Sequence, residues 1–279
     1  PDKSYNLEIL KLTFTAPSSN KDYSLEFLLT IEDGKGGEDS QRTNFFVYHE
    51  PHFERTTIGD GSSFSFRTIN GKPSVIFYDY IEGNLNFASL EENIWKVSNI
   101  GNYDRFNNRV YSISLADING APSIAFLANP DNYGSYSIYH GSRNTDGKWI
   151  INKVSETDSY EDLSLAEIRG MPAIGFIGME TAKLASFNGN FWEIEDVYET
   201  NEGVLFDVSL EEILNEPWMK FVQYNQLEGD IKVGNKGDSS WLFESIPGDN
   251  ITTIGGSLGV INSVPAVAFR TYGGPGLCG

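Results

Sequence analysis

Tyrosine, aspartate and asparagine gather in several loop segments of this 279-residue sequence, and this combination suits carbohydrate binding. An aromatic ring packs on the C–H face of a sugar, while short polar side chains exchange hydrogen bonds with its hydroxyl groups. Turns are also rich in Asp, Asn and Gly for reasons of backbone geometry alone, so loop composition admits both interpretations. The candidate ligand-binding residues are Tyr78, Asp79, Tyr133, Asp158, Tyr160 and Tyr224.

A second set of acidic residues could support a different chemistry, the hydrolysis of glycosidic bonds. Asp117 and Glu167 occupy the same slot of a repeated segment, and Glu211 and Glu212 flank that slot in the next copy. Hydrolysis needs two or three carboxylates about 5–9 Å apart. Because other copies carry unrelated residues there, we favour a non-catalytic binding module. A polysaccharide-acting glycoside hydrolase or lyase is the alternative.

Nucleophiles and metal ligands receive little support from the sequence. The chain has no Gly-x-Ser-x-Gly motif, and Pro51 interrupts the pair His49 and His52, so the helix of a zinc-binding His-Glu-x-x-His cannot form there. Hard oxygen ligands are abundant, but they lack the spacing of a calcium loop. We expect no catalytic residue and no cofactor, with calcium as the alternative.

The elements that must position these residues are given by an internal repeat. Five ungapped segments fit the pattern Ser-[Leu/Phe]-x-x-Ile-x-x-x-Pro-x-x-x-Phe, and their closing phenylalanines are 45 to 50 residues apart. A sustained period of this size indicates stacked or radially arranged supersecondary units. The segments are 65–77, 114–126, 164–176, 209–221 and 257–269.

Each copy predicts two β-strands around a tight turn. In residues 111–126, apolar residues alternate up to Leu115, Asn119-Gly120 supplies the turn, and Pro122 starts the second strand. We predict that the repeated serine faces the crowded centre and hydrogen-bonds to backbone there.

A second strand pair follows most copies and is led by an aromatic residue. Its lead residues are Trp95, Trp149, Trp192 and Trp241, which we expect to pack between neighbouring units. No such pair follows the fifth copy, but residues 44–58 have the same form, with Phe53 in place of Trp. The two halves therefore predict one shared unit built from both ends of the chain, which would remove the open edges of a linear array.

These repeats resemble those of the β-propeller superfamily, specifically bacterial repeats of the form Ser-Leu-Ala-x-x-x-Gly-x-Pro-x-Ile-Ala-Phe followed by a Trp strand. The resemblance covers residues 43–270 and implies an all-β, five-bladed β-propeller of four-stranded antiparallel blades, with N- and C-terminal strands sharing the closing blade. Six blades are the alternative. We expect residues 1–40 to be an N-terminal β-hairpin extension and 41–279 to be the propeller.

Charge limits the choice of partner. The formal net charge is −19, a surface that repels nucleic acid and anionic membranes, and no apolar run is long enough to span a bilayer. We therefore expect a glycan or protein ligand, no nucleic acid, no membrane insertion, and an extracellular or cell-surface location. A subunit of a surface filament is a further alternative, and the sequence leaves the oligomeric state open.

Overall fold

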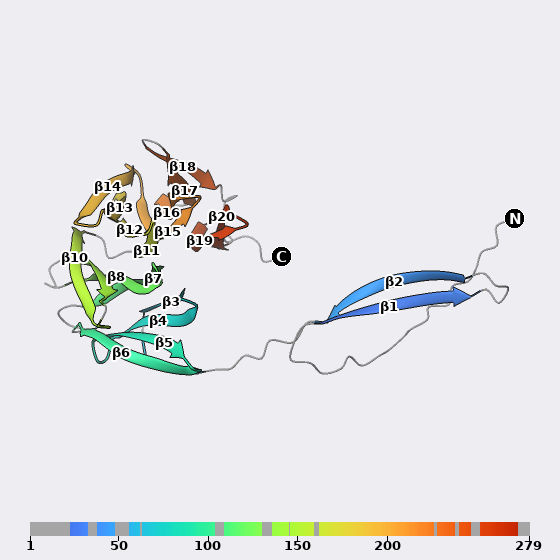
Figure 1. The fold of residues 1–279 in the computed structure, drawn as a ribbon. Coiled ribbons are helices and arrows are strands. Elements are labelled where there is room, and N and C mark those ends of the chain that lie inside the picture. Colours follow the sequence, from blue (N-terminus) through green and yellow to red (C-terminus); the bar gives the residue numbers. More distant parts are fainter. Residues whose placement is uncertain are drawn as a thin grey trace. The chain divides into compact units, whose positions relative to one another are not determined.

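The chain, seen as a computed structural model, divides into two units, Pro1–Thr57 and Ile58–Gly279, and we describe each by itself. The structure describes residues 23–32, 38–47, 56–61, 63–103, 109–129, 136–144, 146–158, 162–225, 228–237, 240–246 and 252–272. In the first unit, β1 (Tyr23–Glu32) and β2 (Glu38–Val47) form a two-stranded antiparallel sheet. The second unit contains β3 to β20 (Figure 1).

Four antiparallel sheets of four strands follow one another along the second unit, and we call them blades 1 to 4. Blade 1 contains β3 (Ser63–Ile69), β4 (Lys72–Asp79), β5 (Asn84–Glu91) and β6 (Ile94–Asn102). Blade 2 contains β7 (Val110–Ile118), β8 (Ala121–Ala128), β9 (Tyr136–Arg143) and β10 (Trp149–Thr157). Blade 3 contains β11 (Leu163–Ile168), β12 (Met171–Ile177), β13 (Thr181–Phe187) and β14 (Trp192–Glu199). Blade 4 contains β15 (Val204–Ile213), β16 (Glu216–Asn225), β17 (Glu228–Lys236) and β18 (Trp241–Ile246).

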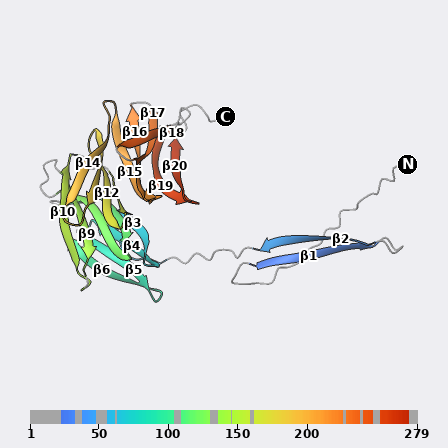
Figure 2. The same cartoon turned by 45° about the horizontal axis from the view of Figure 1, so that its top comes forward.

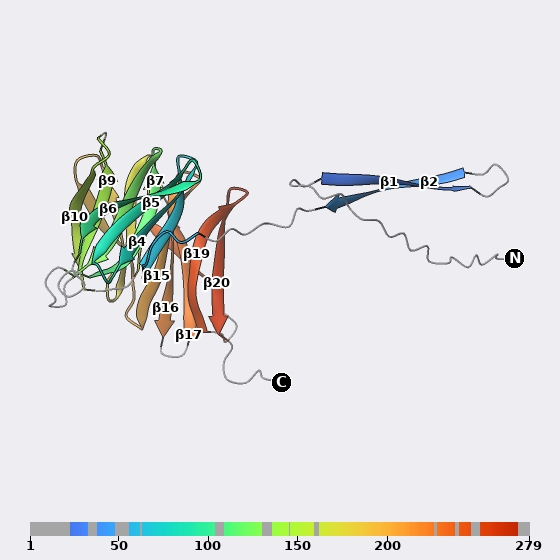
Figure 3. The ribbon, with the colours of Figure 1, turned by 90° about the horizontal axis from the view of Figure 1, so that it is seen from below.

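The last two described strands, β19 (Thr252–Ile261) and β20 (Val264–Tyr272), form an antiparallel pair after blade 4. In each blade the strands follow chain order from the inside outwards, so that β3, β7, β11, β15 and β19 lie towards the centre of the unit (Figure 1). The strand pair β19–β20 stands beside blade 4 (Figure 2), and the strands of all the sheets run roughly along one direction (Figure 3).

The turn between the first two strands of each repeat has the predicted chemistry. In blade 2, Asn119 and Gly120 have φ values of 53° and 79°, which fit the two central positions of a type I′ turn. In blade 3 the first of these positions is Arg169, and its φ of 53° shows that a long charged side chain tolerates the same backbone. The turn thus holds a fixed geometry while its side chain varies.

Apolar clusters fill the spaces between consecutive blades. Leu115 and Phe126 of blade 2 belong to the cluster shared with blade 1, and Leu165 and Phe176 of blade 3 belong to the cluster shared with blade 2. The repeated leucine and phenylalanine therefore face the preceding blade.

Tryptophans at the start of the outermost strands seal these interfaces. The Trp149 ring lies edge-on to Phe87 of the preceding blade at 5.5 Å, and Trp192 lies edge-on to His140 at 5.1 Å. The prediction that these tryptophans pack between units is confirmed for both.

The repeated serines join the inner strands to one another. Each serine hydroxyl accepts a hydrogen bond from the backbone N–H of the leucine that follows the equivalent serine in the next repeat, at 2.9–3.2 Å. The prediction that these serines bond to backbone at the centre is confirmed. The four links are Ser65 with Leu115, Ser114 with Leu165, Ser164 with Leu210, and Ser209 with Leu258.

One interface uses a buried charge. Lys220 lies on β16 at the position held by Ala125 in blade 2, and its side chain is fully buried. Its ammonium group pairs with the Asp207 carboxylate and donates to the Gly256 carbonyl of β19 at 3.0 Å. Burial lowers the pKa of Lys220, and the charge of Asp207 opposes that shift.

The N-terminal region differs from the sequence prediction. Residues 44–47 of the expected outer pair 44–58 lie in β2 and pair with residues 23–26 of β1, while 48–55 fall outside the described residues. The boundary between units follows Thr57, not residue 40. The alternating sequence of 23–32 explains this, because it gives β2 a nearby antiparallel partner.

The serine links generate a prediction about stability. Ser164→Ala removes the acceptor for the N–H of Leu210, a fully buried residue, so the free energy of unfolding should fall by about 1–3 kcal/mol. Urea denaturation would measure this change. Ser240→Ala, at an exposed position before β18, is the control and should change stability by less than about 0.5 kcal/mol. Equal effects of the two substitutions would contradict a structural role for the link.

Candidate functional site

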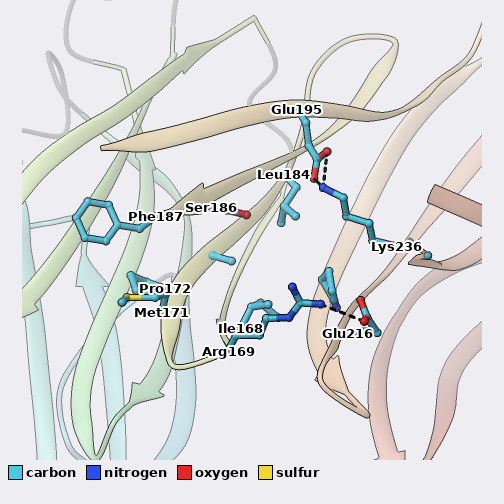
Figure 4. A pocket seen from close by; sticks show the side chains of 13 residues that line it. Ile168, Arg169, Met171, Pro172, Leu184, Ser186, Phe187, Glu195, Glu216 and Lys236 are labelled. Atoms are coloured by element: carbon cyan, nitrogen blue, oxygen red, sulfur yellow. Dashed lines mark hydrogen bonds and ion pairs between the residues drawn. The ribbon is translucent and has the colours of Figure 1, made fainter. Parts of the chain in front are cut away.

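Clefts open between consecutive blades where the type I′ turns lie. The cleft between blades 3 and 4, which we call the 3/4 cleft, has a volume of about 500 Å³ (Figure 4). Its walls combine apolar and charged side chains, and the ion pairs face one another across the opening. Among its lining residues are Ile168, Arg169, Pro172, Leu184, Phe187, Glu195, Glu216 and Lys236.

Two ion pairs span the 3/4 cleft, each with one partner from either blade. Lys236 at the end of β17 donates to both carboxylate oxygens of Glu195 on β14, at 2.7 and 2.8 Å. Arg169 in the β11–β12 turn donates from Nη2 to Glu216 at 3.0 Å and from Nε to the Asn215 carbonyl at 3.0 Å. All four charged side chains remain accessible to solvent, so a ligand in the cleft could contact them.

The charges within the 3/4 cleft balance. Two cations and two carboxylates supply strong donors and acceptors side by side, whereas Leu184, Pro172 and Phe187 supply apolar surface. Such a site can exchange several hydrogen bonds with a neutral polyhydroxylated molecule and pack on its C–H faces.

The 2/3 cleft, between blades 2 and 3, is smaller, about 300 Å³, and lacks charged side chains among its lining residues. Ser123 and His140 lie at its base, with 2.7 Å between the serine hydroxyl and His140 Nε2, and the Trp192 ring forms part of a wall. Burial lowers the pKa of His140 to about 4, so this imidazole is neutral near pH 7.

The 1/2 cleft, of about 160 Å³, repeats the position between blades 1 and 2. Lys72, Glu91 and Arg143 line it, and the Arg143 guanidinium lies 5.5 Å from the centre of the Phe87 ring. Three consecutive interfaces thus carry clefts of decreasing size and different chemistry at one end of the molecule.

The structure places the sequence-predicted ligand residues at the other end, where the second and fourth strands finish. Tyr78 is fully buried, and its hydroxyl donates to the Tyr103 carbonyl at 2.7 Å, so this ring belongs to the core and a ligand in solvent cannot reach it. Its position as the last buried residue of β4 explains the difference, because strand alternation continues through Tyr78. Tyr133 and Tyr160 lie outside the described residues.

Local backbone contacts occupy the remaining candidates. Asp79 accepts the N–H groups of Ile81 and Glu82 in its own turn, and Asp158 accepts the N–H of Met179 at 3.1 Å. Tyr224 is half-buried, with its ring 6.5 Å from that of Phe206. The structure does not bring these residues together into one pocket among those found in the described part of the chain.

The repeated carboxylates cap turns. Asp117 accepts the N–H of Asn70 at 2.7 Å, and Glu167 accepts that of Asn119 at 2.7 Å, each in the turn of the preceding blade. Glu212 contacts the N–H of Arg169 in the same way. These three side chains therefore satisfy backbone donors at positive-φ residues, a structural use that accounts for their repetition.

One remaining pair connects blades that are not consecutive. Arg67 of blade 1 donates to Glu211 of blade 4 at 2.7 Å, which ties two inner strands 144 positions apart. Within the described ranges, no group of three or more His, Cys, Asp or Glu side chains is placed to hold a metal ion. No helix among the described residues is long and apolar enough to cross a membrane.

Loop composition missed the residues of the 3/4 cleft. A signal was present in the repeat itself, since Arg169 stands where blades 1 and 2 have asparagine and Glu216 stands where blade 2 has alanine. Charged residues that break a repeat consensus at a turn are typical of sites freed from a purely structural role.

Comparisons with known proteins show the fold. No protein-family model and no curated protein sequence matches the chain. A fucose-specific lectin from Aleuria aurantia superimposes with a TM-score of 0.55 at 13% identity, over 90% of this chain and 88% of the lectin. A second structure of an Aleuria aurantia fungal lectin, described as a six-bladed β-propeller, gives 0.55 at 12% identity over the same shares. An endo-arabinanase from Bacillus licheniformis gives 0.43 at 11% identity, over 76% of this chain and 95% of that one.

At these identities the likeness establishes the fold alone: an all-β chain of four-stranded antiparallel sheets in the manner of a β-propeller.

The buried histidine generates a prediction about pH. The unfolded chain protonates His140 near pH 6.5 and the folded chain near pH 4, so folding excludes a proton between these values. The free energy of unfolding should therefore fall as the pH drops through this window, by about 3 kcal/mol from His140 alone. His140→Gln should give a shallower decline between pH 7 and pH 4.5 in urea denaturation. A decline as steep as that of the unsubstituted protein would show that His140 does not stay neutral.

Proposed function

We propose that this chain is a non-catalytic carbohydrate-binding module whose principal site is the 3/4 cleft. The observation that carries the proposal is the pair of solvent-accessible ion pairs, Arg169 with Glu216 and Lys236 with Glu195, beside the apolar wall of a cavity of about 500 Å³. A cavity of this size accommodates one or two sugar units.

The ligand class follows from the chemistry of the cleft. Guanidinium and ammonium groups donate to sugar oxygens, carboxylates accept from sugar hydroxyls, and neighbouring groups of opposite sign match adjacent hydroxyls on one ring. Because cations and carboxylates balance, the cleft favours a neutral sugar over an acidic or amino sugar. Leu184 and Phe187 suit the less polar face or the methyl group of a deoxy sugar.

The clefts differ between interfaces, so we propose one dominant site instead of a series of equal ones. Only the 3/4 cleft, of the three, has two opposed ion pairs along its opening. The similarity in fold to a fucose-specific lectin supports L-fucose as the first probe. A binding role of this kind accords with the expected extracellular or cell-surface location, and a protein ligand carrying such a glycan would be bound through the same cleft.

A glycan array followed by calorimetry tests the proposal. The unsubstituted protein should retain one or more neutral glycans, and Arg169→Met and Glu195→Gln should each weaken that binding about tenfold or more, because each removes charge-assisted hydrogen bonds to the ligand. Lys153→Met is the control, since Lys153 pairs with Glu156 on β10, away from the cleft. It should leave affinity unchanged.

Two results would oppose the proposal. Retention of no neutral glycan would remove the assigned ligand class. Binding that survives both cleft substitutions, with thermal unfolding unchanged, would place the ligand elsewhere on the molecule.

A further inference from the structure

The first blade exposes an apolar surface that the other blades bury. Phe66 on β3 follows the repeated serine, at the position of Leu115, Leu165 and Leu210 in blades 2 to 4. Those leucines are fully buried at the interface with the preceding blade, whereas Phe66 is 55% exposed. Phe64, on the same side of the strand, is also exposed. Blade 1 therefore presents an interface without the sheet that covers it in every later blade.

The final strand pair is incomplete in a complementary way. Phe269 on β20 is 43% exposed, although the equivalent Phe126, Phe176 and Phe221 are buried. In blade 2 the cover is supplied in part by the third strand, where Tyr139 stacks on Phe126 at 5.1 Å. In the described residues β20 pairs with β19 alone, so its other edge offers unpaired backbone groups. The pair lacks the outer two strands that each blade possesses.

The serine links stop at the same place. Four of the five repeated serines accept an N–H from the next repeat, but Ser257 instead donates weakly to the adjacent Leu258 carbonyl at 3.4 Å. The residue that would continue the series is Phe66, which follows Ser65 in the first copy. Ser257 and Phe66 are therefore the two ends of an interrupted series of contacts.

The chain approaches blade 1 as it approaches the later blades. Between β6 and β7, the connecting segment places Tyr103 against Phe126, with ring centres 5.0 Å apart. Before β3, the corresponding segment passes over Phe77 so closely that a Cβ at Gly59 would lie 2.8 Å from that ring. The chain thus enters β3 along the path taken from an outermost strand to the next inner one.

We propose that the exposed seam, defined by Phe64 and Phe66 on β3 and by the free edge of β20, is the docking site for the β1–β2 hairpin of the same chain. The hairpin adds β1 beside β20 and β2 outside it, which completes a fifth four-stranded blade in the strand order of blades 1 to 4. Its position just before β3 in the sequence matches that of β5–β6 before β7.

The hairpin suits this role because it is incomplete alone. A two-stranded sheet has marginal stability in water and gains from adding to an open edge. Residues 25–31 alternate apolar and polar types, a pattern typical of strands with one covered face. Fifteen residues separate β2 from β3, more than the connections between blades require, and this tether gives the hairpin a high effective concentration at the seam.

Hydrogen exchange on the full chain, combined with a measurement of mass by light scattering, tests the docking. We expect a monomer in which β20, β1 and β2 are protected to a similar degree, at least about a hundredfold over an unpaired strand edge. Fast exchange along β20 would overturn the proposal, as it would if the hairpin formed part of a separate sixth blade. Protection found only in a dimer would assign the covering hairpin to a second copy and would equally overturn it.

A substitution provides an independent measurement. Phe66→Asp should lower the midpoint of thermal unfolding by about 5 °C or more if the ring is covered, because a charge would then be buried in an apolar interface. Phe191→Asp is the matched control, since Phe191 is exposed to a similar degree in the turn before β14 and lies away from the seam. Equal shifts for the two variants would show that Phe66 stays in solvent. Neither measurement depends on glycan binding.

Discussion

The contact on which the second unit depends is the hydrogen bond from one inner strand to the serine hydroxyl of the preceding repeat. An inner strand pairs with its own blade along one edge only, so its other edge would leave N–H groups buried at the centre without partners. A small hydroxyl satisfies one such donor and holds consecutive inner strands at a constant separation. The glutamate or aspartate three residues later does the same at the turn, as Asp117 does for Asn70. Two polar contacts per interface therefore fix how each blade stands on the last, and the apolar clusters fill the space so defined.

This arrangement explains why variable chemistry can appear between blades without cost to the fold. The turn backbone is fixed by two positive-φ residues and by a carboxylate from the next blade, and neither depends on the turn side chain. Asn119 uses its amide to bond to the Gly170 carbonyl at 2.8 Å, which fills the space between the tips of blades 2 and 3. Arg169, at the equivalent position, extends to Glu216 and leaves a larger cavity beneath it. A single change of residue at a tip thus converts a structural contact into the wall of a cleft.

The sequence was sufficient for features that recur and insufficient for features that occur once. Five copies of one pattern averaged out local ambiguity, and the strand pairs, the Asn-Gly turn, the serine contacts and the packing of Trp149 and Trp192 followed from it. The ligand residues were chosen from loop composition, which cannot distinguish a side chain that binds a ligand from one that caps its own turn, as Asp79 does. Tyr78 failed for a related reason, since the end of a strand is not visible in the sequence to within one residue. The clefts were missed because they require the distance between residues of neighbouring repeats, which no single repeat contains.

The interface between blade 4 and the last strand pair shows how far the repeat can depart from its consensus. Its central position carries Lys220, a fully buried cation, where blade 2 has alanine. The cost of removing an ammonium group from water is met by the Asp207 carboxylate and by two carbonyl oxygens, those of Asp207 and Gly256. Apolar packing tolerates sliding, whereas this arrangement loses its compensation if β19 shifts by an ångström or two. A polar lock of this kind is therefore of most use where a strand pair lacks the outer strands that would otherwise hold it, which is the situation of β19 and β20.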